Sequence, residues 1–191
     1  MDERTLKTLG YNKIIQKLIR YAVSSMAKEI AQNLKPSSNY SEIIHMQKET
    51  REAVGMTLRK GSIPLGGFRD VRSALRRVKI GGILSSSELI HIADLLRVCK
   101  KVKNYAKDDR KQEVYELLDS FFEGIMTLPS VENEITRCIV SEEEIADEAS
   151  STLYNLRREM KSINEKIKEQ LQKIIHSSSN QTILQESVIT I

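Results

Sequence analysis

Apolar residues recur every three or four positions along most of this chain, which is the spacing of amphipathic α-helices. The stretches with this spacing lie at about 12–34, 40–58, 71–78, 85–105, 114–122, 129–138 and 150–176. Near the C-terminal end, QTILQESVITI shows the β-branched pattern of a strand. The chain is therefore predicted to be all-α, with a helical core domain, a long projecting helix of the lever or coiled-coil kind, and a short C-terminal strand.

Polar residues, glycines and a proline mark the expected ends of these helices. Ser85 and Glu88 have the spacing of a capping box. The Gly81–Gly82 pair suits the left-handed turn that ends a helix, and Pro129 suits a first helical turn. The other predicted caps are Asn12, Asn39, Asp70 and, for the last helix, Ser150 or Ser151, with a bend or restart at Ser24 or Ser25. The predicted buried face of the helix over 40–58 holds Ile43, Met46 or Gln47, Thr50, Ala53, Val54 and Leu58.

The last helix has the most regular pattern. Its apolar positions alternate between spacings of three and four, which defines a heptad seam of Leu153, Leu156, Met160, Ile163 and Ile167. A helix of roughly 25 residues spans about 37 Å, more than a compact domain of this size usually contains. We expect it to project and its narrow seam to need a partner helix. Because no matching helix follows and the strand pattern ends without a turn, we expect the chain to be a piece of a longer protein.

Composition and charge narrow the function classes. Aromatic residues make up only 5% of the 191 positions, with no Trp and three Pro, which is typical of helical proteins. Ten basic residues stand against three acidic ones between 69 and 107, whereas 113–148 holds eleven acidic residues and one arginine. This asymmetry indicates either a domain with one basic and one acidic face or two solvated helix surfaces packed together. The net charge of +4 permits nucleic-acid binding without requiring it.

No stretch has the pattern of an enzyme active site. Neither PLGGFRD nor KIGGILS has the residues of a nucleotide-binding loop, so both glycine pairs are interpreted as turns. His45, His91 and His176 are scattered, and no metal site or catalytic residue is predicted. Cys99 and Cys138 lack metal-ligand spacing and are expected to be buried free thiols. With neither a signal peptide nor a membrane-spanning run, we expect a cytoplasmic protein.

Basic residues are the remaining candidates for a binding site. Those on the short helix after Asp70 share a face, and others flank the seam of the last helix. They are predicted either to contact phosphates or to form solvated faces. The nucleic-acid-binding candidates are Arg72, Arg76, Arg77, Arg157, Arg158, Lys161, Lys166, Lys168 and Lys173.

Several stretches, in this order, resemble the MutS-two family, the bacterial MutS paralogues that lack the mismatch-recognition domain. They include PLGGFRD, GGILSSSEL and DEASSTLYNLRR, and the similarity runs from Leu6 to Ile191. The resemblance implies a helical core domain at 1–149, an outgoing lever helix at 150–176 and the truncated start of a clamp at 177–191. Family members continue into a dimerising ATPase that uses ATP and Mg²⁺, and usually end in a small nuclease domain.

The resemblance also implies a function for the longer protein, because family members suppress recombination by acting on branched DNA and split collided ribosomes in translation quality control. This chain lacks the ATPase motifs and the nuclease domain, so it is expected to be non-catalytic and to hold no cofactor. Our leading hypothesis is a scaffold that transmits nucleotide-dependent motion through the 150–176 helix. The alternative is a helical adaptor that binds a partner helix through the Leu153 to Ile167 seam.

Overall fold

The computed structural model describes residues 3–107 and 115–177, and these residues form helices connected by turns and loops. The fold-class prediction is confirmed, since the only strand-like pairing within these two ranges is an isolated bridge between Ile139 and Ile145. The predicted C-terminal strand lies outside the described residues. The helices are α1 (Glu3–Thr8), α2 (Tyr11–Tyr21), α3 (Ser25–Gln32), α4 (Tyr40–Lys60), α5 (Arg72–Lys79), α6 (Ser86–Lys107), α7 (Glu116–Glu123), α8 (Pro129–Cys138), the short 3₁₀ helix η1 (Asp147–Ala149) and α9 (Ser151–His176).

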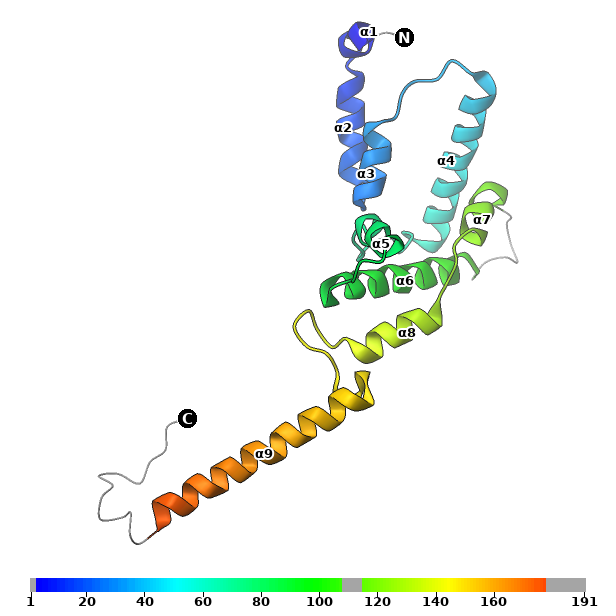
Figure 1. Cartoon of the computed structure of the whole chain (residues 1–191). Coiled ribbons are helices and arrows are strands. Elements are labelled where there is room, and N and C mark those ends of the chain that lie inside the picture. The colour runs from blue at the N-terminus through cyan, green and yellow to red at the C-terminus, as the bar shows by residue number, and fades with distance from the viewer. Residues whose placement is uncertain (1–2, 108–114, 178–191) are drawn as a thin grey trace.

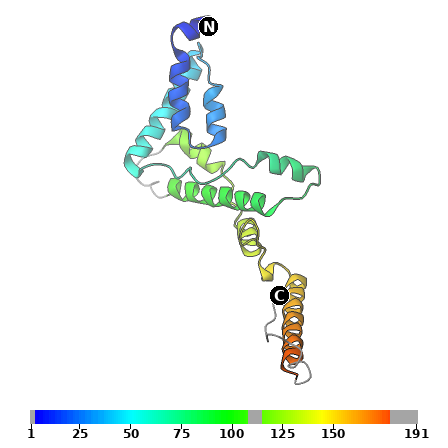
Figure 2. The same ribbon diagram turned by 90° about the vertical axis from the view of Figure 1, so that its left-hand side faces the viewer.

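The helices form a branched, elongated arrangement (Figure 1). α2 and α3 pack together as one arm, and α4 forms a second arm that meets α7. α6 lies across the base of both arms and packs against α7 and α8. From α8 the chain passes through η1 into α9, which points away from all other helices in both views (Figures 1 and 2).

The main hydrophobic cluster joins α4, α6 and α7. Its buried members are Met56, Val98, Val102, Ala106, Tyr115 and Phe122. α7 begins with no cap of its own, but the carboxylate of Glu52 on α4 accepts hydrogen bonds from the backbone N–H groups of Leu117 (3.0 Å) and Leu118 (3.2 Å). Glu52 thus satisfies donors at the start of α7 and fixes that helix against α4.

The glycine turn predicted at the end of α5 and the capping box predicted at the start of α6 are confirmed, whereas the cap predicted at Asp70 is wrong. Gly81 adopts a left-handed φ of 82°, and the N–H of Gly82 donates to the Arg77 carbonyl over 2.9 Å, so α5 ends in a glycine turn. In the capping box of α6, the N–H of Ser85 donates to the Glu88 carboxylate over 2.9 Å and the N–H of Glu88 donates to Ser85 Oγ over 3.3 Å. Asp70 accepts from the N–H of Arg72 at 2.9 Å, although Val71 occupies the N-cap position.

Two further expectations about the first half of the chain were wrong. Asn12 lies inside α2, which starts after Gly10 in a left-handed conformation. On α4 the buried residue is Met56, whose exposed fraction is 1%, whereas Leu58 is 82% exposed. The apolar positions of α4 extend around much of its surface, so periodicity alone did not identify the side that packs on α6 and α7.

The caps at Ser24 and Asn39 are confirmed by hydrogen bonds from Ala27 and from Ser41 and Glu42.

Helix α9 matches its predicted span. Ser150 Oγ caps it by accepting from the N–H of Leu153 over 3.1 Å, and 26 residues follow without a break. None of these residues is buried. The packing of α9 within the described residues is with η1 at its start, so nearly all of the helix stands free. The domain boundaries at 149/150 and 176/177 stay predictions.

Candidate nucleic-acid interface

The seam of α9 faces solvent along its length. Leu156, Met160, Ile163 and Ile167 have exposed fractions between 47% and 62%, while Leu153 near the cap is half-buried. No other described helix covers this face. The apolar stripe is therefore present as the sequence predicted, but it lacks the partner helix that a heptad seam requires.

Arginines fix the start of α9 to the preceding loop. Arg157 Nη1 donates to the Ile145 carbonyl over 2.8 Å and pairs with the carboxylate of Asp147. Arg137 on α8 donates to the Glu148 carbonyl over 2.5 Å and pairs with Glu134. Arg157, one of the nucleic-acid candidates, therefore has a structural role where α9 leaves the rest of the fold.

The other basic candidates on α9 are exposed and have no ion-pair partner within the described residues. They are Arg158, Lys161, Lys166, Lys168 and Lys173. Three glutamates, at 159, 165 and 169, alternate with them along the same helix. Opposite charges within one or two helical turns weaken the potential that a phosphate experiences, so α9 presents a mixed rather than a uniformly basic surface.

On α5, two of the three candidate arginines are held by carboxylates. Arg72 contacts both Asp70 and Glu29, each with an N–O separation of 2.7 Å, and links α5 to α3. The hydrogen bonds that Arg72 donates hold the pKa of Asp70 below its usual value, and the same hydrogen bonds to the Asp70 carboxylate raise the pKa of Arg72. Arg77 pairs with Glu88 at the start of α6. Arg76 is exposed and forms no ion pair in the part of the chain that the structure describes.

Three lysines that the sequence analysis did not single out lie on one face of α6. Lys100, Lys103 and Lys107 line a cleft of about 360 Å³ between α6 and the start of α8. Their spacing of three and four positions was visible in the sequence, but only the packing of α8 beside α6 shows that they line a common cleft. Arg97 Nε lies 3.7 Å from Glu132 of α8, so opposite charges also meet where these helices pack, as one of the two charge interpretations expected.

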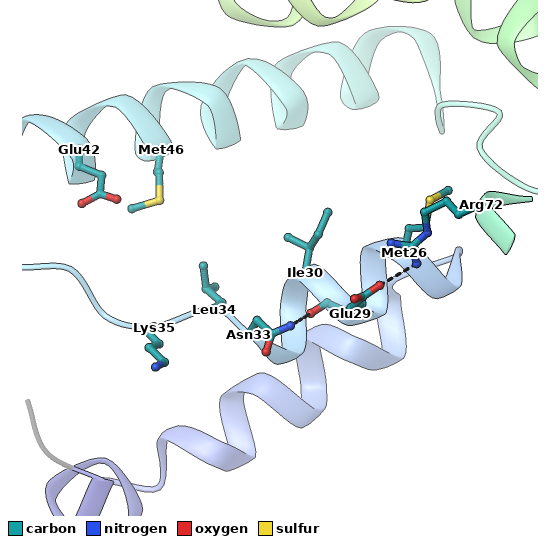
Figure 3. Close-up of a pocket in the computed structure, with 9 residues that line it drawn as sticks. All are labelled: Met26, Glu29, Ile30, Asn33, Leu34, Lys35, Glu42, Met46 and Arg72. Carbon is teal, nitrogen blue, oxygen red and sulfur yellow. Dashed lines mark hydrogen bonds and ion pairs between the residues drawn. The ribbon is translucent and has the colours of Figure 1, made fainter. Parts of the chain in front are cut away.

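A groove of about 680 Å³ lies between α3 and α4 (Figure 3). Met26, Ile30 and Leu34 from one side and Met46 from the other supply its apolar lining. The ion pair between Glu29 and Arg72 closes one end. The groove exposes apolar side chains of the two arms to solvent.

The residues with catalytic or metal-binding chemistry remain apart. Within 3–107 and 115–177, no three His, Cys, Asp or Glu side chains are grouped so as to hold a metal ion. His45 pairs with Glu49 at 3.2 Å on the surface of α4. Cys99 and Cys138 are free thiols that are half-buried rather than fully buried, and desolvation raises the pKa of Cys99.

None of the described helices combines the length and apolar character needed to cross a membrane.

Comparison with known proteins identifies the relatives of this chain. No family model matches it. The chain is 41% identical over 190 residues to endonuclease MutS2 of Alkaliphilus oremlandii, 42% over 192 residues to that of Acetivibrio thermocellus and 38% over 191 residues to that of Clostridium novyi. Each match covers 100% of this chain and 24% of the relative.

These matches show that the chain is similar over its whole length to a segment of MutS-like proteins. More particularly, the resemblance to the MutS-two family is confirmed, because the chain is similar from end to end to a segment of proteins named endonuclease MutS2. The chain spans about a quarter (24%) of the length of the curated relatives it matches.

Proposed function

We propose that this chain is the non-catalytic core-and-lever segment of a MutS-like, DNA-binding ATPase of the endonuclease MutS2 type. In this proposal the full-length protein is cytoplasmic, forms a homodimer through its ATPase domain and acts on branched DNA, on collided ribosomes or on both. ATP and Mg²⁺ bind in that ATPase domain, and the segment described here needs no cofactor. Its role is to carry nucleotide-dependent motion to a clamp.

The single observation that supports this role best is the geometry of α9. A capped helix of 26 residues is fixed at one end by Arg157 and is free along the rest of its length. A helix of this length spans about 39 Å. Such a rod, anchored at one end, converts a small rotation of the anchored end into a larger displacement of the far end.

The exposed apolar faces of the two arms support the proposal that further chain segments complete this fold. Ile30 on α3 is 71% exposed, and Val54 on α4 is more than half exposed, with the groove of Figure 3 between the arms. Contiguous exposed apolar patches mark surfaces that other protein segments cover. A segment that spans 24% of its relatives is expected to expose the faces that the remainder covers.

A proline in the middle of α9 tests the lever role in the full-length protein. Ile163→Pro removes a backbone hydrogen bond and costs roughly 3 kcal/mol in a helix interior, so the rod should kink. We expect the ATP-dependent change in affinity for branched DNA to be lost, while ATP hydrolysis in the absence of DNA persists. Fluorescence anisotropy with and without ATP measures the first quantity, and phosphate release measures the second.

The matched control is Ser151→Pro, because Ser151 is the first residue of α9 and a proline is tolerated there. This variant should keep the ATP-dependent change in DNA affinity. A normal response in Ile163→Pro would show that α9 does not transmit motion. If both proline variants lose the ATP-dependent change in DNA affinity, the assay reports folding rather than the transmission of motion. That result would also remove the support for the lever role.

The second candidate, a helical adaptor, is favoured by the exposed seam itself. A stand-alone adaptor would use Leu153 to Ile167 to form a stable coiled-coil pair, whereas a lever segment should associate weakly. Sedimentation velocity of the 191-residue chain at micromolar concentration separates the two. A dimer that Met160→Glu converts to a monomer would support the adaptor, and a monomer would support the lever segment.

A further inference from the structure

One face of α6 carries an unmixed row of lysines. Lys100, Lys103 and Lys107 occupy positions i, i+3 and i+7, so they lie above one another along the helix. From residue 95 to the end of α6 at Lys107 there is no acidic residue. The row faces the segment 127–129, where α8 begins, and the two helices enclose the cleft between them. We call this feature the α6–α8 lysine cleft.

Two of the three ammonium groups are available to a ligand. Lys100 and Lys107 are exposed and have no ion-pair or hydrogen-bond partner within the described residues. Lys103 is half-buried, and its Nζ donates to the Ile125 carbonyl over 2.8 Å, which holds it in the cleft wall. A lysine ammonium has three donors, so Lys103 retains two for a ligand.

The local charge balance of the cleft is positive. Among the described residues that line it, the one carboxylate is that of Glu132, which lies 3.7 Å from Arg97 Nε. Because Arg97 also pairs with Asp94 at 2.6 Å, the charge of Glu132 is only partly opposed. Asn104 adds an uncharged amide to the lining. The start of α8 has no side-chain cap, which adds a weak positive potential to that of the lysines. The described lining holds three lysines and one carboxylate, a higher ratio of basic to acidic groups than on α9, which makes this face more favourable to anions.

We propose that the α6–α8 lysine cleft binds the sugar–phosphate backbone of a nucleic-acid strand. Seven residues separate Lys100 from Lys107, which corresponds to about 10.5 Å along a helix and to about three nucleotide steps of 3.4 Å per strand. The cleft lining holds no aromatic side chain on which a base could stack. Binding is therefore independent of sequence and dominated by phosphate contacts.

This inference rests on the nucleic-acid part of the proposed function but not on the lever role of α9. It also differs from the candidates derived from sequence, since none of the three lysines was among them. It locates a backbone contact on the core, beside the junction of α6 and α8, rather than on the projecting helix.

The test compares salt-dependent binding of labelled duplex and single-stranded DNA by the complete 191-residue chain and by Lys100→Gln/Lys107→Gln. Both lysines are exposed, so the double variant should fold normally, which circular dichroism checks. On duplex DNA each lost phosphate contact lowers the slope of log affinity against log salt by about 0.9, and on single strands by about 0.7. We expect a loss of about 1.8 in the duplex slope and at least a tenfold weaker affinity at low salt.

The charge-matched control is Lys28→Gln/Lys101→Gln. Lys101 is exposed on α6 next to Lys100 but does not line the cleft, and Lys28 is exposed on α3. The control should lower the slope by less than 0.5, since it removes the same net charge without removing a contact. Equal losses of slope in the two double variants would overturn the proposal, because they would show only a general effect of net charge.

Two further outcomes would also overturn the inference. If the wild-type chain does not bind DNA at low salt, the cleft is not a phosphate site, while the lever role of α9 stands and is tested separately by Ile163→Pro. If a polyglutamate peptide or inorganic phosphate displaces DNA at equal concentration of negative charge, the cleft accepts anions in general rather than a nucleic-acid backbone. Resistance to both competitors, with a reduced slope in the cleft variant alone, supports the proposal.

Discussion

Helices α6 and α9 are similar in length and in the way they begin, yet they differ completely in burial. α6 has 22 residues and α9 has 26, and a serine caps each of them. α6 buries Ala93, Val98, Val102 and Ala106, whereas α9 buries no residue. The comparison shows that an apolar stripe defines which side of a helix can pack but not whether this chain supplies the surface that it packs on.

The two helices therefore depend on different sources of stability. Burying a large apolar side chain contributes about 1.5–3 kcal/mol, so α6 is held by its contacts with α4, α7 and α8. α9 relies on helix propensity and on its capped first turn, whereas most helical stability in proteins comes from the packing of an amphipathic face. We expect α6 to unfold with the whole core and α9 to open on its own.

The largest change in the free energy of unfolding is expected from a mutation in the hydrophobic cluster that holds α6. Met56→Ala removes the most buried side chain of the α4–α6–α7 cluster and leaves a cavity, which should lower the free energy of unfolding by about 2–5 kcal/mol. Leu58→Ala, two residues along on the exposed side of α4, should change it by less than about 0.5 kcal/mol. Urea denaturation measures both. Similar losses in the two variants would contradict the assignment of the packed face of α4.

The second-largest effects are expected from mutations of the two helix caps, which should affect α6 and α9 differently. Ser85→Ala removes the cap of α6 and should lower the global free energy of unfolding by about 1 kcal/mol, because α6 is part of the core. Ser150→Ala removes the cap of α9 and should leave global unfolding unchanged while speeding amide exchange in the first turns of α9. Urea denaturation and hydrogen exchange together check this contrast, and a global loss from Ser150→Ala would show that α9 unfolds with the core.

A smaller, pH-dependent effect is expected at the start of α6. The backbone N–H of Ser85, and then Arg77, hold the pKa of Glu88 below its usual value of 4.5. Since the folded-state pKa is depressed, the carboxylate contributes stability above the unfolded-state pKa and loses it as the pH falls through the folded-state value. At pH 7 the melting temperature of the wild type should be higher than that of Glu88→Gln, and the difference between the two melting temperatures should shrink below pH 4. A constant difference between pH 7 and pH 3 would contradict this role of the carboxylate.

The smallest effect is expected on the seam. Ile163→Ala removes an exposed side chain, so the free energy of unfolding of this chain should change by less than about 0.5 kcal/mol. The same substitution in the proposed full-length protein should cost about 2 kcal/mol or more if a partner helix covers the seam there. Thermal unfolding of both forms gives the comparison, and a large loss in the isolated chain would mean that the seam is already covered.

Local signals in the sequence predicted the fold well. The capping box at Ser85 and Glu88, the glycine turn at Gly81 and the cap at Ser150 depend on interactions within a few residues, so the sequence contains all the information they need. The caps expected at Asn12 and Asp70 are local errors, since α2 starts after Gly10 and α5 after Val71, but the other errors fall where distant segments decide the outcome. The cap of α7 comes from Glu52, which lies 65 residues before Leu117, and no local pattern could have indicated this contact.

The candidate site was predicted less completely for the same reason. Arg72, Arg77 and Arg157 were predicted as nucleic-acid-binding candidates, but Glu29, Glu88 and Asp147 pair with them. Of these contacts, the one with Glu29 joins segments 43 residues apart. The three lysines of the α6–α8 lysine cleft have an ordinary helical spacing, and only the position of α8 shows that they share a cleft.

Hydrogen exchange of α9 in this chain and in the proposed full-length protein tests whether a partner helix covers the seam. If the seam is completed by a helix outside this chain, amides from 156 to 171 should exchange at least ten times more slowly in the full-length protein, while the buried turns of α6 stay protected in both forms. Equal and rapid exchange of the α9 amides in both forms would show that the seam has no partner, and would contradict the account of α9 as one half of a paired lever.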